Sequence, residues 1–286
     1  MSIPRDVQEF LDEYPDVVDD PTSRANFEFY SNNFRCMPDN RTIEEIHERW
    51  FGEYAKLEYK HGYIQWLFPI REYGMNYESQ PLQTHEIRAM KADPTIIARI
   101  IESYKLMLDF YGMRLVSVDT GLVARVLPPK NYEVHYRNLV RSSHNNLRIS
   151  RILKCLSELG LERLNAGFLL HVLSEQSEAN ELNSRGIRGS MDRWWANCLR
   201  NEQERSWIGD LIRRVREEDF LFTREDYEQA LERRDQTGHL GIQEEILIPE
   251  GQEESSIQPE TDQRGVVTSG DTTLAEETGG QGTHDE

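Results

Sequence analysis

Residues 93–112, DPTIIARIIESYKLMLDFYG, decide the fold class of this chain. Asp93 is suited to cap a helix, and Pro94 fits the first helical position, where an amide hydrogen would have no partner. Apolar residues then recur at steps of three and four, which predicts one buried helical face. That face consists of Ile97, Ile100, Ile101, Tyr104, Met107 or Leu108, and Tyr111. Gly112 can end the helix in the left-handed conformation, so the stretch predicts a helix packed on a core.

The same helical spacing recurs along most of the chain. Thr42 and Glu45 form a capping box at the start of a predicted helix over 42–59. Further helices are predicted at 84–92, 131–140, 143–160, 166–176, 190–220 and 223–234. Only 113–129 alternates like a strand; a short hairpin turning at 119–121 is one interpretation, and we favour an irregular loop. We therefore predict an all-α fold with one mainly helical domain.

Composition predicts the boundaries of that domain. The first 23 residues are acidic and interrupted by prolines, so we expect the domain to span residues 24–235. Residues 236–286 are expected to form a disordered tail, because twelve Asp or Glu and one Arg lie between Gly241 and Glu286. The formal net charge of the chain is −18. We therefore expect no nucleic-acid partner, since such a chain is not suited to a phosphate backbone.

The sequence predicts neither membrane insertion nor secretion. No stretch supplies the roughly 18 uncharged apolar residues that a membrane-spanning helix needs. The first 20 residues are acidic where a signal peptide would be basic and then apolar. Three cysteines (Cys36, Cys155 and Cys198) are widely spaced and odd in number. This pattern favours reduced thiols in the cytosol or nucleus.

Motifs of catalysis are missing from the sequence. It contains no G-x-S-x-G, no H-E-x-x-H, no phosphate-binding G-x-x-x-x-G-K and no C-x-x-C pattern. No histidine is followed by another four residues later, the spacing that points two imidazoles at one metal. Cys155 lies in an apolar helical run and is interpreted as a core residue. We therefore predict that the protein is not an enzyme and that it has no cofactor or metal.

A basic stretch contrasts with the acidic composition of the chain. Between Lys130 and Lys154, six basic residues accompany only one acidic residue, Glu133. The candidate basic patch is Arg137, Arg141, Arg148, Arg151 and Lys154. We favour a solvated helix face as its interpretation. Pairing with the domain's own carboxylates, with the acidic tail or an acidic partner, or with nucleic acid are the alternatives.

The tail contains one candidate binding motif. Ile246, Leu247 and Ile248 lie between acidic residues, a pattern suited to pairing as an extra strand with the sheet edge of a protein partner. It resembles the motifs that bind small ubiquitin-like modifiers in nuclear proteins. Three aliphatic residues beside acidic ones are also common in disordered tails, and this remains the alternative.

Residues 61–76, HGYIQWLFPIREYGMN, include nine consecutive uncharged residues from Gly62 to Ile70. They follow a predicted helix whose apolar face needs covering. We interpret the uncharged run as a buried corner, after which Arg71 and Glu72 return the chain to solvent. The corner would be formed by Tyr63, Ile64, Trp66, Leu67 and Phe68. The lip of a peptide pocket is the alternative.

Four stretches carry a family resemblance. They are WFGEYAKLEYKHGYIQWLFPIREYGMN (50–76), SYKLMLDFYGMRL (103–115), TGLVAR (120–125) and HNNLRISRILKCLSELG (144–160). In the first, Trp50, Gly52, Tyr54, Leu57, Glu58, Tyr63 to Pro69, Arg71 and Glu72 match the pattern. Together they resemble the conserved region of the opioid growth factor receptor family, over approximately residues 27–220.

The resemblance implies a non-enzymatic receptor for the peptide Met-enkephalin that is not a seven-helix receptor. It also implies a protein that restrains cell proliferation and that associates with the nucleus, the perinuclear cytoplasm or, peripherally, with membranes. The sequence shows neither the repeat-rich C-terminal region nor the dense Lys/Arg import cluster of vertebrate members. A regulatory scaffold that binds protein partners and no peptide hormone is the alternative function.

A peptide with a tyrosine amine at one end and Phe-Met at the other needs two kinds of group. A carboxylate is needed for the ammonium, and an apolar or aromatic pocket is needed for the side chains. Glu58 or Glu72 could supply the carboxylate. Tyr63, Trp66 and Phe68 could supply the pocket.

Overall fold

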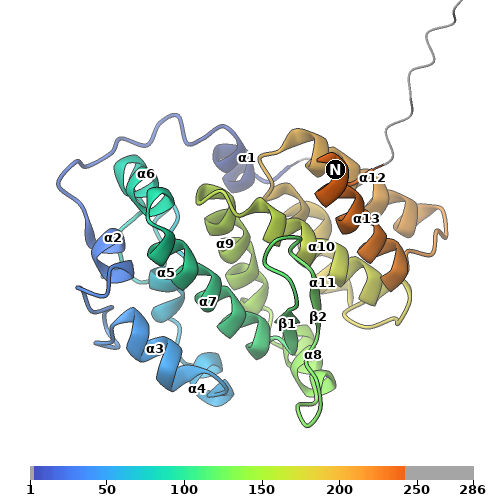
Figure 1. Cartoon of the computed structure of the whole chain (residues 1–286), viewed down its shortest axis with the longest axis horizontal. Coiled ribbons are helices and arrows are strands. Elements are labelled where there is room, and N and C mark those ends of the chain that lie inside the picture. Colours follow the sequence, from blue (N-terminus) through green and yellow to red (C-terminus); the bar gives the residue numbers. More distant parts are fainter. Residues whose placement is uncertain (1–2, 242–286) are drawn as a thin grey trace, which may run out of the picture. The chain divides into compact units, whose positions relative to one another are not determined.

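The computed structural model describes residues 3–241 of the chain (Figure 1). Helices dominate this range, which confirms the predicted all-α class. The elements are α1 (Arg5–Leu11), α2 (Ala25–Tyr30), α3 (Ile43–Trp50), α4 (Tyr54–Tyr59), α5 (Tyr63–Leu67), α6 (Thr84–Ala92), α7 (Pro94–Phe110), β1 (Met113–Leu115), β2 (Val123–Arg125), α8 (Tyr132–Arg141), α9 (His144–Glu158), α10 (Glu162–Ser177), α11 (Arg185–Arg193), the 3-10 helix η1 (Trp195–Asn197), α12 (Glu202–Glu217) and α13 (Arg224–Thr237).

Helix α7 organises the first half of the domain, where it contacts α2, α3, α6 and β1 (Figure 1). Its ends are those that the sequence predicts: Asp93 accepts a hydrogen bond from the Thr95 amide at 2.8 Å, and Gly112 has a φ of 80°. The buried surface is wider than one face and also includes Ile96, Ser103, Leu106, Asp109 and Phe110. Ile97, predicted to be buried, is half-buried.

Helix α10 organises the second half of the domain. It contacts α9, α12 and α13 and is buried continuously from Leu164 to Gln176. A helix that is covered on all sides shows no one-sided periodicity in its sequence. This is why the sequence predicted only a shorter helix over 166–176.

The two short strands correct one prediction. β1 and β2 pair antiparallel, with Met113 opposite Arg125, so the irregular loop that we favoured is wrong and the hairpin interpretation is confirmed. A contact with α10 fixes the turn, because a Cβ on Gly167 would lie 1.8 Å from the carbonyl oxygen of Gly121. Two strands of three residues are too short for a reliable period-two pattern, and this contact between distant segments is not visible in the sequence.

Two predicted long helices are interrupted. The helix predicted over 42–59 ends after α3, turns at Gly52 with a φ of 79°, and resumes as α4. The helix predicted over 190–220 is divided into α11, η1 and α12. At the second break Asn201 caps α12 by accepting a hydrogen bond from the Glu204 amide at 3.1 Å. The periodicity of each region continues through the break, since the pieces bury their apolar faces in the same core.

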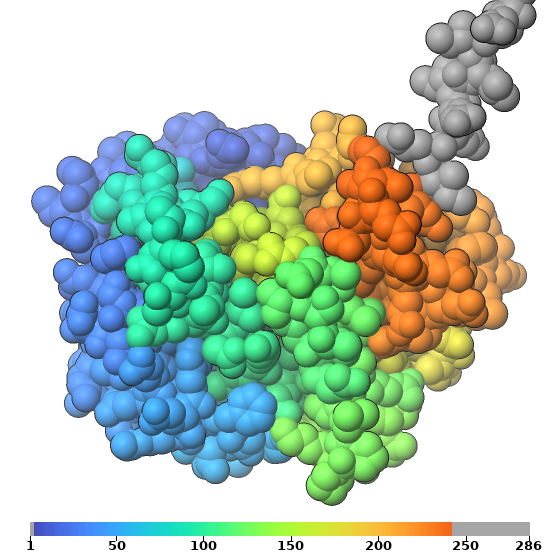
Figure 2. Space-filling view, in the orientation of Figure 1, coloured from blue at the N-terminus to red at the C-terminus, as the bar shows by residue number. Residues whose placement is uncertain are grey.

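Ordered structure begins before Arg24, where the sequence placed the start of the domain. Val7 and Phe10 of α1 are fully buried. The Arg200 guanidinium lies 4.4 Å from the Phe10 ring centroid and donates a hydrogen bond to the Phe10 carbonyl oxygen. In the view of Figure 2, the blue N-terminal segment runs along one edge of the molecule beside the residues of α6. The acidic segment is therefore part of the packed body.

At the other end, helix α13 continues to Thr237, two residues beyond the predicted boundary at 235. The rest of the predicted tail from residue 242 onward lies outside the described residues. Within residues 3–241, no helix combines the length and the apolar character needed to cross a membrane.

Candidate functional site

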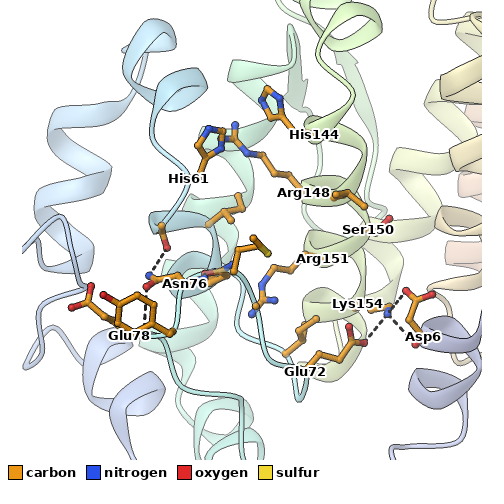
Figure 3. Close-up of a pocket in the computed structure, with 18 of the residues that line it drawn as sticks. Asp6, His61, Glu72, Asn76, Glu78, His144, Arg148, Ser150, Arg151 and Lys154 are labelled. Atoms are coloured by element: carbon orange, nitrogen blue, oxygen red, sulfur yellow. Dashed lines mark hydrogen bonds and ion pairs between the residues drawn. The ribbon is translucent and has the colours of Figure 1, made fainter.

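A cleft of about 720 Å³ lies between α9 and the chain that surrounds α5 (Figure 3). One wall comes from residues 61–78, and the opposite wall comes from residues 144–154 of α9. Asp6 of α1 and Trp194, which follows α11, also line it. The volume falls within the range of roughly 300–1,000 Å³ that is typical of small-ligand sites.

The front of the first wall is a loop of residues 71–78, which we call the cleft loop. Asn76 anchors it: its backbone amide donates to Gln65 Oε1 at 2.8 Å, and its side-chain amide donates to the Met37 carbonyl oxygen at 2.7 Å. The apolar side chains of the loop are nevertheless solvated, with Tyr73 88%, Met75 95% and Tyr77 91% exposed. A fixed backbone with exposed apolar side chains is typical of a binding surface.

The back of the first wall consists of residues 63–68, which we call the aromatic wall. The structure removes Tyr63, Trp66 and Phe68 from the candidate peptide contacts, because all three side chains are buried. The Tyr63 hydroxyl donates to the Leu57 carbonyl oxygen at 3.0 Å, and the Trp66 indole donates to the Met37 carbonyl oxygen at 3.0 Å. They form the buried corner that the sequence favoured, and they support the cleft from behind.

The α9 wall carries three cations at helical spacing, Arg148, Arg151 and Lys154 (Figure 3). At 1.5 Å rise per residue they span about 9 Å along the helix axis. The solvated face that we favoured for the basic stretch is wrong for Arg148 and Lys154, which are buried, whereas Arg151 is half-buried. Arg137 and Arg141, by contrast, are exposed on α8 and do not line the cleft.

Arg148 is fully engaged by the protein. Its guanidinium donates to the carbonyl oxygens of Leu57 at 3.0 Å and Lys60 at 2.8 Å, and it also contacts His61 Nδ1 at 2.9 Å. These carbonyls lie at the C-terminal end of α4, where helix carbonyls lack intrahelical partners and the helix dipole favours a positive charge. Arg148 therefore fixes α4 to α9.

Lys154 is also fully engaged. Its ammonium group lies 2.7 Å from Glu72 Oε1 and 3.1 Å from Asp6 Oδ2. Burial alone would lower the pKa of Lys154, but the carboxylates of Glu72 and Asp6 outweigh burial and raise it. Glu72 also accepts a hydrogen bond from the Tyr14 hydroxyl at 2.7 Å. Glu72 therefore lines the cleft, and its carboxylate is already paired with Lys154.

Arg151 differs from its two neighbours. Its Nε donates to the Phe68 carbonyl oxygen at 2.8 Å. Among the described residues, no carboxylate lies within 4.0 Å of its guanidinium, and its two terminal nitrogens make no hydrogen bond. In Figure 3 the side chain reaches from α9 into the cleft. Burial lowers the pKa of Arg151 to about 10, which leaves it charged at neutral pH.

Glu58 lies behind the end of the cleft that is formed by His61 and His144. Its carboxylate accepts hydrogen bonds from Asn138 at 3.0 Å and Asn145 at 3.2 Å and lies 3.1 Å from His144 Nε2. Burial alone would raise the pKa of Glu58, but these amide hydrogen bonds lower it below its ordinary value. Glu58 therefore joins α4 to α8 and α9, and it does not line the cleft.

The sequence did not single out the exposed apolar residues of the cleft. Met75, Tyr77 and Leu147 line its mouth, and the Leu147 side chain is 73% exposed. Glu78, also on the mouth, is exposed and forms no ion pair within the described part of the chain. One sequence signal could have predicted them. Tyr73, Met75 and Tyr77 alternate with Gly, Asn and Glu directly after the uncharged run.

The cysteines and metal-ligating side chains form no second site in the region that the structure describes. Cys36, Cys155 and Cys198 are buried, and burial raises the pKa of the Cys198 thiol to about 12. No group of three or more His, Cys, Asp or Glu within residues 3–241 is arranged to hold a metal ion. Residues Ile246, Leu247 and Ile248 lie outside the described residues.

Residues 19–229 match the model of the opioid growth factor receptor (OGFr) conserved region. The opioid growth factor receptor of Homo sapiens is 40% identical over 203 residues, which is 70% of this chain and 29% of that protein. The opioid growth factor receptor-like protein 1 of Rattus norvegicus is 37% identical over 203 residues, which is 70% of this chain and 42% of that protein.

The match therefore covers less than half of the length of these relatives. No solved structure matches the chain. The family model spans the cleft loop, the aromatic wall and α9, and it also includes both strands of the hairpin. This chain belongs to the opioid growth factor receptor family.

Proposed function

We propose that the chain is a non-enzymatic receptor that binds an opioid peptide of the Met-enkephalin type in the cleft between the cleft loop and α9. The observation that carries the proposal is the cleft itself. It has a volume of about 720 Å³, and Met75, Tyr77 and Leu147 expose apolar surface at its mouth. The relatives are named opioid growth factor receptors, and this name supplies the class of ligand.

The chemistry of the cleft suits a short peptide with a free amine and apolar side chains. Exposed Glu78 at the mouth has no cationic partner among the described residues and can receive the ammonium group. Tyr77, Met75 and Leu147 can pack on aromatic and thioether side chains, which removes apolar surface from water on both partners. Buried Tyr63, Trp66 and Phe68 keep the wall behind the peptide rigid.

Isothermal titration calorimetry with Met-enkephalin tests the proposal. The full chain should show saturable binding at micromolar or tighter affinity. Leu147→Asp should weaken it at least about tenfold, because it places a charge among the apolar contacts at the mouth. Leu221→Asp is the matched control, since Leu221 is also exposed and does not line the cleft. An absence of binding to the unmodified chain would overturn the proposal.

A second candidate, a regulatory scaffold that binds protein partners and no peptide hormone, is favoured by the cleft loop. Its three exposed apolar side chains, Tyr73, Met75 and Tyr77, offer a contact surface beyond the cleft. Proximity labelling should then lose a specific set of partners in a Tyr73→Ser, Met75→Ser, Tyr77→Ser variant. Deletion of residues 241–286 tests separately whether the acidic tail recruits partners, because identical partner lists would exclude the tail.

Two cellular properties belong to the same proposal. We propose that the protein resides in the nucleus or the perinuclear cytoplasm, or peripherally at membranes, and that it restrains proliferation, because the family resemblance implies both. Imaging and fractionation of the untagged protein test the location. Proliferation should rise when the protein is depleted and fall again when the unmodified chain is restored. If the Leu147→Asp variant restores growth control fully, restraint of proliferation does not depend on the cleft.

A further inference from the structure

The three cations on the cleft face of α9 differ in one respect that bears on ligand chemistry. Arg148 has four carbonyl or amide oxygens and one histidine nitrogen as partners, and Lys154 has two carboxylates and one carbonyl. The terminal nitrogens of both side chains are therefore already engaged as hydrogen-bond donors. Arg151 has a single hydrogen bond, from Nε, and none from its terminal nitrogens. We propose that Arg151 is the anchor for the carboxylate end of the ligand that occupies the cleft.

The Arg151 guanidinium lacks the ion pair that would offset its partial burial. A half-buried guanidinium without a carboxylate partner has lost part of its hydration and has gained no ion pair in return. The backbone carbonyl of Phe68 satisfies one of its five N–H groups, which leaves four for a ligand. An arriving anion would therefore restore the missing interaction without breaking an ion pair within the described part of the chain.

The orientation of the Arg151 guanidinium suits a carboxylate ligand. A guanidinium held at Nε presents its two terminal nitrogens in a fixed plane, which matches the two oxygens of a carboxylate. The hydrogen bond from Nε to the Phe68 carbonyl oxygen supplies that fixed orientation. A lysine at this position would offer a point charge without the planar match.

Apolar side chains in the same cleft indicate the rest of the ligand. Ile64, Ile70, Met75 and Leu147 line the same cleft as Arg151. A carboxylate bound there would carry an apolar group beside it, which describes the C-terminal residue of a peptide ending in an apolar side chain. Inorganic phosphate shares the anionic chemistry but has no apolar part, so it serves as the discriminating probe.

This inference rests on the proposed function for the identity of the whole ligand, but small probes test it separately. The full chain, labelled with ¹⁵N-arginine, is titrated with N-acetyl-leucine, N-acetyl-leucinamide and inorganic phosphate while the arginine side-chain NMR signals are followed. The Arg151 signals, assigned by their loss in Arg151→Lys, should move with N-acetyl-leucine. The amide should bind at least about tenfold more weakly, because it lacks the charge that strengthens the hydrogen bonds. Phosphate should also bind more weakly than N-acetyl-leucine.

Equal binding of acid and amide, or tighter binding of phosphate, would overturn the inference. Arg151→Lys should lower the affinity for N-acetyl-leucine about tenfold or more, whereas Arg137→Lys, on the exposed face of α8, should leave it unchanged. Far-UV circular dichroism and the unfolding midpoint verify that both variants are folded. Should Arg151→Lys not fold, the comparison of acid with amide in the unmodified chain still decides the question.

Met-enkephalin and its C-terminal amide distinguish this inference from the proposed function. Equal affinities for the two peptides would support the proposed function and would contradict the role of Arg151 as the carboxylate anchor. If neither peptide binds but N-acetyl-leucine binds at Arg151, the result would contradict the proposed function and would still support a carboxylate site at Arg151.

Discussion

The aromatic wall and the cleft loop are adjacent in the chain and rich in aromatic residues, but they have opposite environments. Tyr63 and Trp66 in the wall are buried and hydrogen-bonded to backbone carbonyls. Tyr73 and Tyr77 in the loop are almost fully solvated on a backbone held by Asn76. The aromatic wall, the most distinctive part of the sequence, therefore stabilises the fold. The surface available to a ligand is the cleft loop, which lies directly after it.

The largest expected effect comes from the wall. Trp66→Ala should lower the free energy of unfolding by about 3–5 kcal/mol, because it removes a fully buried aromatic side chain and leaves a cavity. Chemical denaturation measures the change. A loss below about 1 kcal/mol would contradict the structural role of the wall.

Acidification should destabilise the folded chain through its buried histidines. Burial in α10 lowers the pKa of His171 to about 3, so the unfolded chain takes up a proton near pH 6.5 and the folded chain does not. Stability is then complete above about pH 6.5 and falls with decreasing pH, by about 2–3 kcal/mol between pH 6.5 and 4.5. His47, whose pKa is lowered by burial to about 4, adds to the same loss. Denaturation curves across this range should be less pH-dependent in His171→Gln; unchanged pH dependence would contradict this assignment.

The junction between wall and cleft should give a smaller effect. Arg148→Met leaves the carbonyl oxygens at the end of α4 without their donors, which should lower the free energy of unfolding by about 2 kcal/mol. Arg137→Met, a matched change of an exposed arginine, should stay within about 0.5 kcal/mol. Equal losses in the two variants, measured by urea denaturation, would show that Arg148 does not hold α4 to α9.

The smallest effect on stability should come from the cleft loop. Tyr77→Ala should change the free energy of unfolding by less than about 0.5 kcal/mol, because the side chain is 91% exposed. The same substitution should weaken the proposed binding of Met-enkephalin about tenfold in calorimetry. A strong loss of stability would contradict the solvated environment of Tyr77. Unchanged peptide affinity would contradict the assignment of the cleft loop as a peptide contact.

Local patterns predicted the elements that present one apolar face to the core. Helix α7 carried its Asp93 cap, its apolar period and its Gly112 stop in a single stretch, so its bounds could be predicted. Helix α10 could not be bounded in the same way, since burial on all sides leaves no period. The hairpin depends on the approach of Gly121 to Gly167, 46 residues apart in the sequence.

The candidate site was less predictable for the same reason. Arg148, Arg151 and Lys154 have equivalent positions in the sequence pattern, and only the fold decides which of them finds a partner. The partners of Arg148 come from residues 57–61 and 145, and those of Lys154 come from residues 6 and 72. The aromatic residues that looked suited to a peptide pocket are buried, because the same apolar character also drives them into the core.

Photo-cross-linking tests most directly whether Met-enkephalin binds between the cleft loop and α9. Met-enkephalin carrying a photoreactive group on its Phe is irradiated with the full chain, and the modified residues are identified by mass spectrometry. The proposal predicts that cross-links are concentrated in residues 73–78 and 147–151 and that an excess of unlabelled peptide removes them. Competable cross-links confined to other parts of the chain would contradict the assignment of the cleft as the peptide site.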